Sequence, residues 1–348
     1  MLRRGLLGAL FAMAALLPVY AADKQPDINQ TVAFPGGAVM HRDLVYAAMD
    51  GFRPLTLDLY ETPSKAKTAP RPLILFVHGG DWATGDARHL AGFPDFPSTL
   101  AALAAKGYVV ASVNYRLSGE AHFPAAVQDV KSAVRWLRGH AADYNIDPTR
   151  MMAWGAEAGG QIAAMVGTSC GVGALEPTAD AKSKATLASD CVQGVVDWYG
   201  PADLASWESG GAHPSEPGAP TRLGAYLGCE TADCTPGLVR AASPHSYISS
   251  LTPPFLIQHG SADTRVPPEQ SQKLNDALRD QHVPADILIY PGMGQDFSKD
   301  GAPDPAANAK ALADMEDFAA KIFPQAQPSA NSSAKRNPTK TAKPKARK

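Results

Sequence analysis

The sequence predicts an α/β domain in which a mostly parallel β-sheet is covered by helices on both faces. Two observations carry this prediction. Short apolar runs typical of buried strands alternate with segments whose apolar residues recur at helical spacing. The 348 residues are also 45% apolar and 19% charged, a composition that suits one large globular domain with a full core.

The expected strands are seven short apolar segments. The first alternates apolar and polar residues and follows a turn signal at Asp50-Gly51. The later segments are continuous apolar runs, as in strands that are buried on both faces. In chain order, the expected strands are residues 55–60, 72–77, 108–113, 151–154, 192–199, 254–258 and 287–290.

The expected helices fall between these strands. Residues 125–140, for example, place three valines and a leucine on one stripe. The expected helices are residues 97–106, 125–140, 158–166, 268–279 and 308–322. Residues 200–245 are rich in Pro, Gly and Ser, and we expect them to form an irregular insertion over the carboxyl edge of the sheet, where ligands bind in such folds.

The first 21 residues are predicted to be a secretory signal peptide. Arg3 and Arg4 precede an apolar stretch from Leu6 to Leu17, and small residues lie at the expected cleavage site. The stretch is short for a membrane span, and no later segment is apolar enough to cross a membrane. We therefore expect a secreted or periplasmic protein whose globular domain covers residues 22–323.

The C-terminal residues 324–348 are expected to form a disordered basic tail. They contain seven Lys and Arg residues and no acidic residue. Without this tail and the signal peptide, the domain keeps 23 basic residues against 34 acidic ones, a net charge of −11. The tail is a candidate contact for an anionic surface, although a solvated extension with no specific partner is an equal alternative.

Four cysteines are expected to form two disulfides. An even number of cysteines in an exported chain favours disulfides, and four cysteines allow three pairings. Proximity in sequence favours Cys170 with Cys191 and Cys229 with Cys234. No metal site is expected at these cysteines, because no CxxC pair or nearby histidine cluster is present.

Three motifs follow expected strands and should therefore meet at the carboxyl edge of the sheet. His78-Gly79-Gly80-Asp81-Trp82 comes first, and its glycines allow backbone N–H groups to point at a ligand, as in an oxyanion hole. The second motif, residues 155–160, has the small residues of a sharp strand-to-helix turn with Glu157 at its centre. The third is divided between residues 259–263, which end in Asp263, and residues 290–297, which contain Gln295 and Asp296.

Residues 45–322 resemble the α/β-hydrolase fold. They are most similar to secreted esterases of the hormone-sensitive-lipase and bacterial feruloyl-esterase-like group. In that group the turn reads GxSAGG, the acid follows a strand that ends in HGxxD, and the base lies in PGxxH. Residues 107–117 (GYVVASVNYRL) and 123–137 (FPAAVQDVKSAVRWL) are also similar to this group.

The resemblance assigns a role to each matching position. Gly79 and Gly80 match the oxyanion loop, and Ala158 matches the residue that donates the other N–H group. Asp263 matches the acid of the catalytic triad. Glu157 stands where the family has its serine nucleophile, and Gln295 stands where it has its histidine base. The resemblance implies no cofactor, and the further residues expected at the pocket are His78, Trp82 and Asp296.

These two substitutions predict a pseudo-esterase. Acyl transfer to serine needs a nucleophile that loses its proton and an imidazole that takes and returns it. Gln295 cannot exchange a proton near neutral pH. The Glu157 carboxylate, at a helix N-terminus, is expected to occupy the oxyanion hole itself. The chain would then bind a small ligand or a partner in the former catalytic pocket.

Several alternatives remain open. The chain could hydrolyse small acyl or feruloyl-type esters with a different base, for which His122, His245 and His282 are candidates. Glu157 could act as a carboxylate nucleophile, although the histidine needed to activate water is missing from its expected place. Glu157, Asp263 and Asp296 could also converge on calcium or magnesium. A structural role through the basic tail is a further possibility.

Overall fold

The computed structural model describes residues 30–63, 68–177, 188–209, 221–229 and 234–324. The predicted signal peptide and almost all of the predicted basic tail lie outside these residues. The described residues include no helix that is long and apolar enough to cross a membrane.

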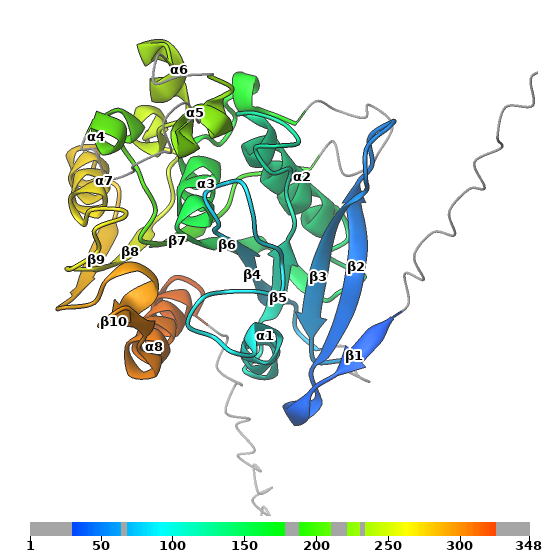
Figure 1. Ribbon diagram of the computed structural model, residues 1–348. Helices are drawn as coiled ribbons and strands as arrows, with labels where there is room; N and C mark the ends of the chain where they lie inside the picture. Colours follow the sequence, from blue (N-terminus) through cyan, green and yellow to red (C-terminus); the bar gives the residue numbers. More distant parts are fainter. Residues whose placement is uncertain (1–29, 64–67, 178–187, 210–220, 230–233, 325–348) are drawn as a thin grey trace, which may run out of the picture.

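A nine-stranded sheet forms the centre of the described part of the chain (Figure 1). Its strand order is β1-β2-β3-β5-β4-β6-β7-β8-β9. Pairing is antiparallel from β1 to β5 and parallel from β5 to β9. The strands are β1 (Thr31–Ala33), β2 (Val39–Ala47), β3 (Leu55–Glu61), β4 (Arg71–Val77), β5 (Val109–Val113), β6 (Ile146–Ala156), β7 (Gly194–Trp198), β8 (Phe255–Gly260) and β9 (Ala285–Tyr290).

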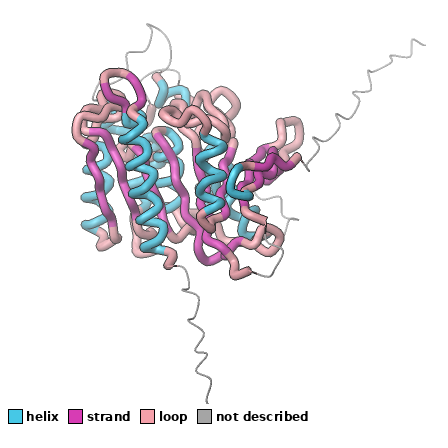
Figure 2. The backbone as a smooth tube through the Cα atoms, turned by 90° about the horizontal axis from the view of Figure 1, so that it is seen from below, coloured by secondary structure: helices cyan, strands magenta, loops and turns pink. Residues whose placement is uncertain are grey.

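Helices cover both faces of the sheet (Figure 2). Buried residues of α1 and α8 belong to one apolar layer, and those of α2, α3 and α7 belong to the other. These helices are α1 (Phe96–Ala105), α2 (Ala125–Gly139), α3 (Ala158–Thr168), α7 (Glu269–Asp280) and α8 (Pro305–Ile322). The predicted α/β-hydrolase fold is confirmed, with the expected alternation of strands and helices.

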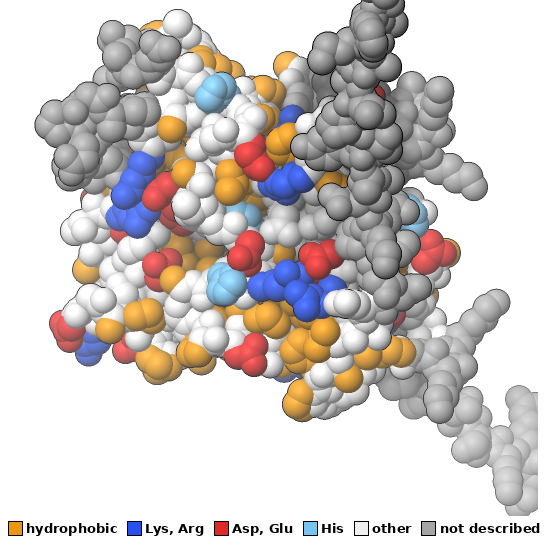
Figure 3. Space-filling model, turned by 45° about the vertical axis from the view of Figure 1, so that its right-hand side comes forward, with side chains coloured by type: hydrophobic (Ala, Val, Ile, Leu, Met, Phe, Trp, Pro, Cys, Tyr) orange, Lys and Arg blue, Asp and Glu red, His pale blue; other side chains and the backbone are white. Residues whose placement is uncertain are grey.

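Acidic and basic side chains lie close together on the face of the molecule that Figure 3 shows.

The N-terminal strands β1 and β2 were not predicted. β2 has charged or titratable residues at its centre (His41-Arg42-Asp43) and consecutive apolar residues after them, so its period-two sequence signal is weak. Its pairing with β3 shows two shifts of register, which further blur that signal.

The described parts of the predicted insertion, residues 200–209, 221–229 and 234–245, are more regular than predicted. They contain α4 (Leu204–Ser209), α5 (Arg222–Leu227) and α6 (Pro236–Ala241), which lie beside α3 and α7 in Figure 1. Thr221 and Thr235 accept hydrogen bonds from backbone N–H groups as N-caps of α5 and α6. Each helix is only six residues long, so periodicity could not reveal it.

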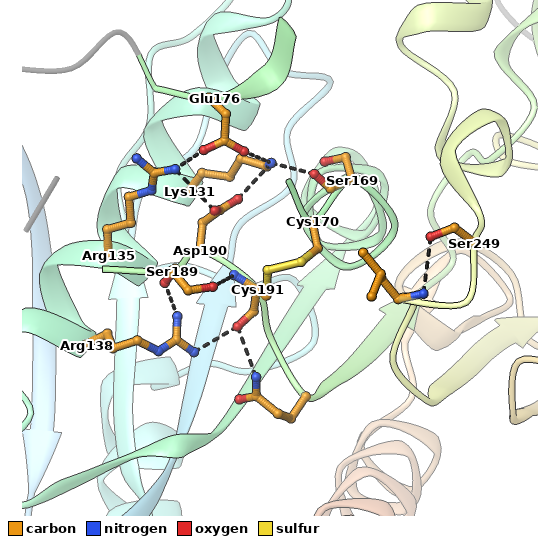
Figure 4. Close-up of a disulfide and its surroundings, with 12 residues drawn as sticks. Lys131, Arg135, Arg138, Ser169, Cys170, Glu176, Ser189, Asp190, Cys191 and Ser249 are labelled. Carbon is orange, nitrogen blue, oxygen red and sulfur yellow. Dashed lines mark hydrogen bonds and ion pairs between the residues drawn. A yellow bond between two sulfur atoms is a disulfide. The ribbon is translucent and has the colours of Figure 1, made fainter. Parts of the chain in front are cut away.

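Both expected disulfides are present, Cys170–Cys191 and Cys229–Cys234. The first lies beside a buried ion-pair network (Figure 4). There, Lys131 is fully buried and its Nζ lies 2.7 Å from Asp190 Oδ2 and 3.2 Å from Glu176 Oε1.

Candidate functional site

Glu157 stands on the sharp turn between β6 and α3. Its φ of 53° and ψ of −116° lie in a region that non-glycine residues rarely adopt. The neighbouring glycines make this turn possible. A Cβ atom on Gly155 would lie 2.0 Å from the carbonyl oxygen of Gly159, and one on Gly159 would lie 2.0 Å from that of Val77. The small residues therefore let the turn pack against β4 and hold the Glu157 side chain at the sheet edge.

One oxygen of the Glu157 carboxylate accepts hydrogen bonds from two backbone N–H groups of the loop after β4. Gly80 N–H donates to Oε2 at 2.7 Å, and Asp81 N–H donates to the same oxygen at 2.9 Å. The side chain is buried, at 5% exposure, and its other oxygen, Oε1, has no hydrogen-bond partner among the described residues. The carboxylate thus occupies donors of the kind that stabilise an oxyanion in acyl transfer.

The protonation of Glu157 is shifted toward the neutral pH range. Burial raises the pKa of its carboxyl to about 7, and the nearby charge of Asp81 acts in the same direction. The backbone N–H groups of Asp81, Ala158 and Gly80 favour the charged form and limit the rise. The group is therefore part neutral and part ionised near pH 7.

Asp81 links this loop to two arginines. Its Oδ1 accepts from Arg222 Nη1 of α5 at 2.9 Å, and its Oδ2 accepts from Arg265 Nη2. Burial by itself would raise the pKa of Asp81. The hydrogen bond and ion pair with Arg265 outweigh burial and hold this pKa below its ordinary value. Asp81 is therefore a charged neighbour of Glu157 whose own charge is balanced by Arg222 and Arg265.

Asp263 follows β8 and meets Gln295 at the same edge. Its Oδ1 accepts from the backbone N–H of Arg265 at 2.8 Å and from that of Val266 at 3.0 Å. With the amide of Gln295 oriented to pair donor with acceptor, its nitrogen donates to Asp263 Oδ1 at 3.1 Å and Oδ2 at 2.6 Å. The buried ring of His259 also lies near Asp263, with Nε2 3.4 Å from Oδ2. Gln295 thus makes the contact that a triad histidine makes with its acid.

A cavity of about 230 Å³ opens beside these groups. Its polar side chains come from the oxyanion loop, the turn at Glu157 and the loops after β8 and β9. It is lined by His78, Gly79, Gly80, Gly85, His89, Leu90, Ala91, Ala156, Glu157, Arg265, Gln295 and Asp296. Burial raises the pKa of the Asp296 carboxyl at the cavity wall.

Comparison with known proteins identifies the family to which this site belongs. The BD-FAE family model matches residues 57–278, which include the oxyanion loop, the turn at Glu157 and Asp263. The chain belongs to this family of α/β-hydrolase esterases.

Two curated esterases of Mycobacterium tuberculosis are among its relatives. Esterase LipQ is 33% identical over 230 residues, which are 66% of this chain and 51% of LipQ. Esterase LipC is 31% identical over 284 residues, which are 79% of this chain and 66% of LipC. The chain therefore spans between about half and two thirds of the length of these relatives.

Solved esterase structures share the fold. A truncated carbohydrate esterase from gut microbiota superposes with a TM-score of 0.68 and 28% identity, covering 83% of this chain and 98% of that one. Esterase 2 of the planctomycete Thermogutta terrifontis superposes with a TM-score of 0.64 and 26% identity, covering 84% of this chain and 96% of its own.

The oxyanion loop of this BD-FAE member differs from the predicted arrangement in the residues whose N–H groups reach position 157. The N–H groups that reach Glu157 are those of Gly80 and Asp81, one residue further along the chain than the predicted pair Gly79 and Gly80. Gly79 instead lies so close to Glu157 that a Cβ atom there would be 3.0 Å from Oε2.

Trp82 does not line the cavity, contrary to the prediction that it lies at the pocket. It is fully buried, stacks on Tyr226 of α5 at 4.4 Å between ring centroids, and donates from Nε1 to Gln161 Oε1 at 3.0 Å. Trp82 therefore joins the oxyanion loop to α3 and the insertion. His78 does line the cavity and stacks on Tyr115 at 4.3 Å, and its burial lowers its pKa to about 4.

None of the three histidines proposed as replacement bases lines the cavity. His122 and His282 are exposed, and the ring of His245 contacts the carbonyl oxygen of Ala202. The histidine at the cavity rim is His89, which sequence analysis did not single out because it lies in a loop with no motif. Its Nδ1 lies 2.8 Å from Asp86 Oδ1.

The proposed cation site is not formed. Within the part of the chain that the structure describes, no group of three or more His, Cys, Asp or Glu side chains could hold a metal ion. Glu157 and Asp263 instead accept hydrogen bonds from the backbone and from Gln295.

Sequence analysis did not identify Arg265 as a residue of the cavity wall, although it lies only two residues after Asp263.

Proposed function

We propose that this chain is an exported, carboxylesterase-like protein that has lost ester-cleaving activity and binds a small ligand in the cavity beside Glu157. The observation that carries the proposal is the position of the Glu157 carboxylate. Its Oε2 accepts the N–H groups of Gly80 and Asp81 and leaves neither free for a substrate carbonyl oxygen.

The absence of a histidine base at position 295 also lowers the expected ester-cleaving activity. Gln295 donates to Asp263 but has no group that can take a proton from a nucleophile. In serine hydrolases, loss of the triad lowers kcat by about 10⁶, and the remaining rate depends on the oxyanion hole and on binding. Here the oxyanion donors are also occupied, so even that remaining rate should be reduced.

Export is supported by two disulfides that the chain can form, Cys170–Cys191 and Cys229–Cys234. Structural disulfides persist in oxidising compartments such as the periplasm and the extracellular space. In such a compartment, the basic residues 324–348 would be free to contact an anionic surface. Binding of the full chain and of a chain truncated after residue 323 to anionic lipid vesicles tests this contact, and equal binding contradicts it.

Hydrolysis of nitrophenyl acetate tests the main proposal. Purified wild type should release no nitrophenol above the rate in buffer, whereas Glu157→Ser/Gln295→His should hydrolyse the ester. Each single substitution is the control, because it restores only one of the two missing groups. Hydrolysis by the wild type would contradict the proposal.

The second candidate function is hydrolysis of small acyl or feruloyl-type esters. The observation that favours it is His89, which lies at the cavity rim and whose Nδ1 contacts Asp86, the arrangement that orients a catalytic imidazole. If the wild type is active on nitrophenyl or feruloyl esters, His89→Ala should abolish the activity. His122→Ala is the matched control, because that exposed histidine is absent from the cavity wall.

A further inference from the structure

The cavity beside Glu157 contains a buried hydrogen-bond acceptor that the protein itself does not satisfy. Both loop N–H groups donate to Oε2, whereas Oε1 is buried without a hydrogen-bond partner among the described residues. Buried polar atoms in native proteins nearly always have a partner, which can be a bound molecule. Because Glu157 lines the cavity, a ligand there can supply the missing donor.

The other groups of the cavity wall favour a ligand that donates hydrogen bonds and carries positive charge. Asp296 adds a second carboxyl group, and Gln295 uses its amide nitrogen on Asp263, which leaves its amide oxygen as an acceptor. The main-chain donors of the oxyanion loop are occupied. The cavity wall therefore offers a ligand mainly hydrogen-bond acceptors.

Arg265 is the one cationic side chain among the residues that line this cavity, apart from the titratable His78 and His89. Its Nη2 donates to Asp81, but its buried Nε has no hydrogen-bond partner among the described residues. The residues that line the site thus include a carboxylate oxygen without a donor and a guanidinium N–H without an acceptor in the described part of the chain.

We propose that the cavity binds the primary ammonium group of a small molecule, with Glu157 as its counter-ion. This inference rests on the proposed function, because a working esterase would need the same N–H groups free for its substrate. An ammonium group has three donors and no acceptor, which matches Glu157 Oε1, Asp296 and the amide oxygen of Gln295. The ligand is either a simple amine or an amino acid whose carboxylate accepts from Arg265.

The test measures binding of three probes to the full-length mature protein, by ligand-observed NMR at a pH above the pKa of Glu157. The probes are n-butylamine, alanine and butyrate. Butylamine or alanine should bind, and butyrate should not. Tighter binding of alanine, lost in Arg265→Gln, identifies the amino acid as the ligand class, whereas equal or tighter binding of butylamine identifies the simple amine.

Variants then locate the binding. Glu157→Gln should weaken amine binding about tenfold or more, because it removes the charge from the hydrogen bond while keeping the side-chain shape. Asp296→Asn should weaken it less, and it carries the test if Glu157→Gln does not fold. Glu269→Gln makes the same chemical change on the exposed first turn of α7 and should leave binding unchanged.

Three results would overturn the inference: no binding of either ammonium probe, butyrate binding as tightly as butylamine, or amine binding that survives both Glu157→Gln and Asp296→Asn. Hydrolysis of nitrophenyl acetate by the same preparations separates this failure from that of the proposed function. A hydrolysing wild type contradicts the proposed function. A silent wild type that prefers butyrate contradicts the ammonium site alone.

Discussion

The buried carboxyl of Glu157 is expected to make the folded protein less stable as the pH rises. Comparing the free energy of unfolding of the wild type with that of Glu157→Gln isolates this effect. Burial raises the pKa of the carboxyl from 4.5 to about 7. Between these values the folded chain keeps a proton that the unfolded chain has released. The stability from this proton is therefore fully present below pH 4.5 and lost as the pH rises through 7. The loss is on the order of 3 kcal/mol, since one unit of pKa is worth about 1.4 kcal/mol.

Urea unfolding of the wild type and Glu157→Gln, with disulfides intact, measures this loss. We expect the free energy of unfolding of the wild type to fall relative to the variant as the pH rises from about 4 to about 8. Other buried carboxyls, such as Asp197, whose pKa burial raises to about 6, are common to both proteins and cancel in the difference. Glu269→Gln should follow the wild type. A difference between wild type and Glu157→Gln that does not change with pH would refute the reasoning.

Three further substitutions test how the structure supports the site. Lys131→Met should lower the free energy of unfolding by roughly 3 kcal/mol, the low end of the range for breaking a buried ion pair, because the Asp190 carboxylate loses its lysine and keeps Arg135 at 3.3 Å; an unchanged urea midpoint would contradict this. Cys170→Ser/Cys191→Ser removes a disulfide with a sequence separation of 21 and should lower the free energy of unfolding in urea by about 3 kcal/mol. Equal urea midpoints of variant and wild type would argue against this. Trp82→Ala should lower the free energy of unfolding by about 3–5 kcal/mol, because the fully buried indole joins the oxyanion loop to the insertion. Calorimetry should show a lowered Tm, and an unchanged Tm would contradict this structural role of Trp82.

The sequence was sufficient to predict the elements that bring the site together. Each of the three motifs follows a buried strand, and strands that run parallel end at the same edge of a sheet. Glu157 and Asp263 could therefore be placed together although 106 residues separate them in the numbering. The strands were visible because their burial on both faces requires continuous apolar runs.

The remaining features depend on contacts between distant loops, which local patterns do not record. The pairing of Arg265 with Asp81 joins residues 184 positions apart and has no periodic signal. Asp81 has a positive φ of 55°, a conformation that its residue type does not predict. His89 reaches the cavity only through the path of its loop.

Covalent labelling by an organophosphate ester tests the central claim most directly, namely that this is an esterase site disabled at positions 157 and 295. Phosphorylation at position 157 requires a nucleophile, a base and free oxyanion donors at once. Intact-mass analysis after treatment with paraoxon should show no adduct on the wild type and one adduct on Glu157→Ser/Gln295→His, located at position 157 by peptide mapping. A folded double variant that remains unlabelled, or a wild type that is labelled in the cavity, would contradict the account.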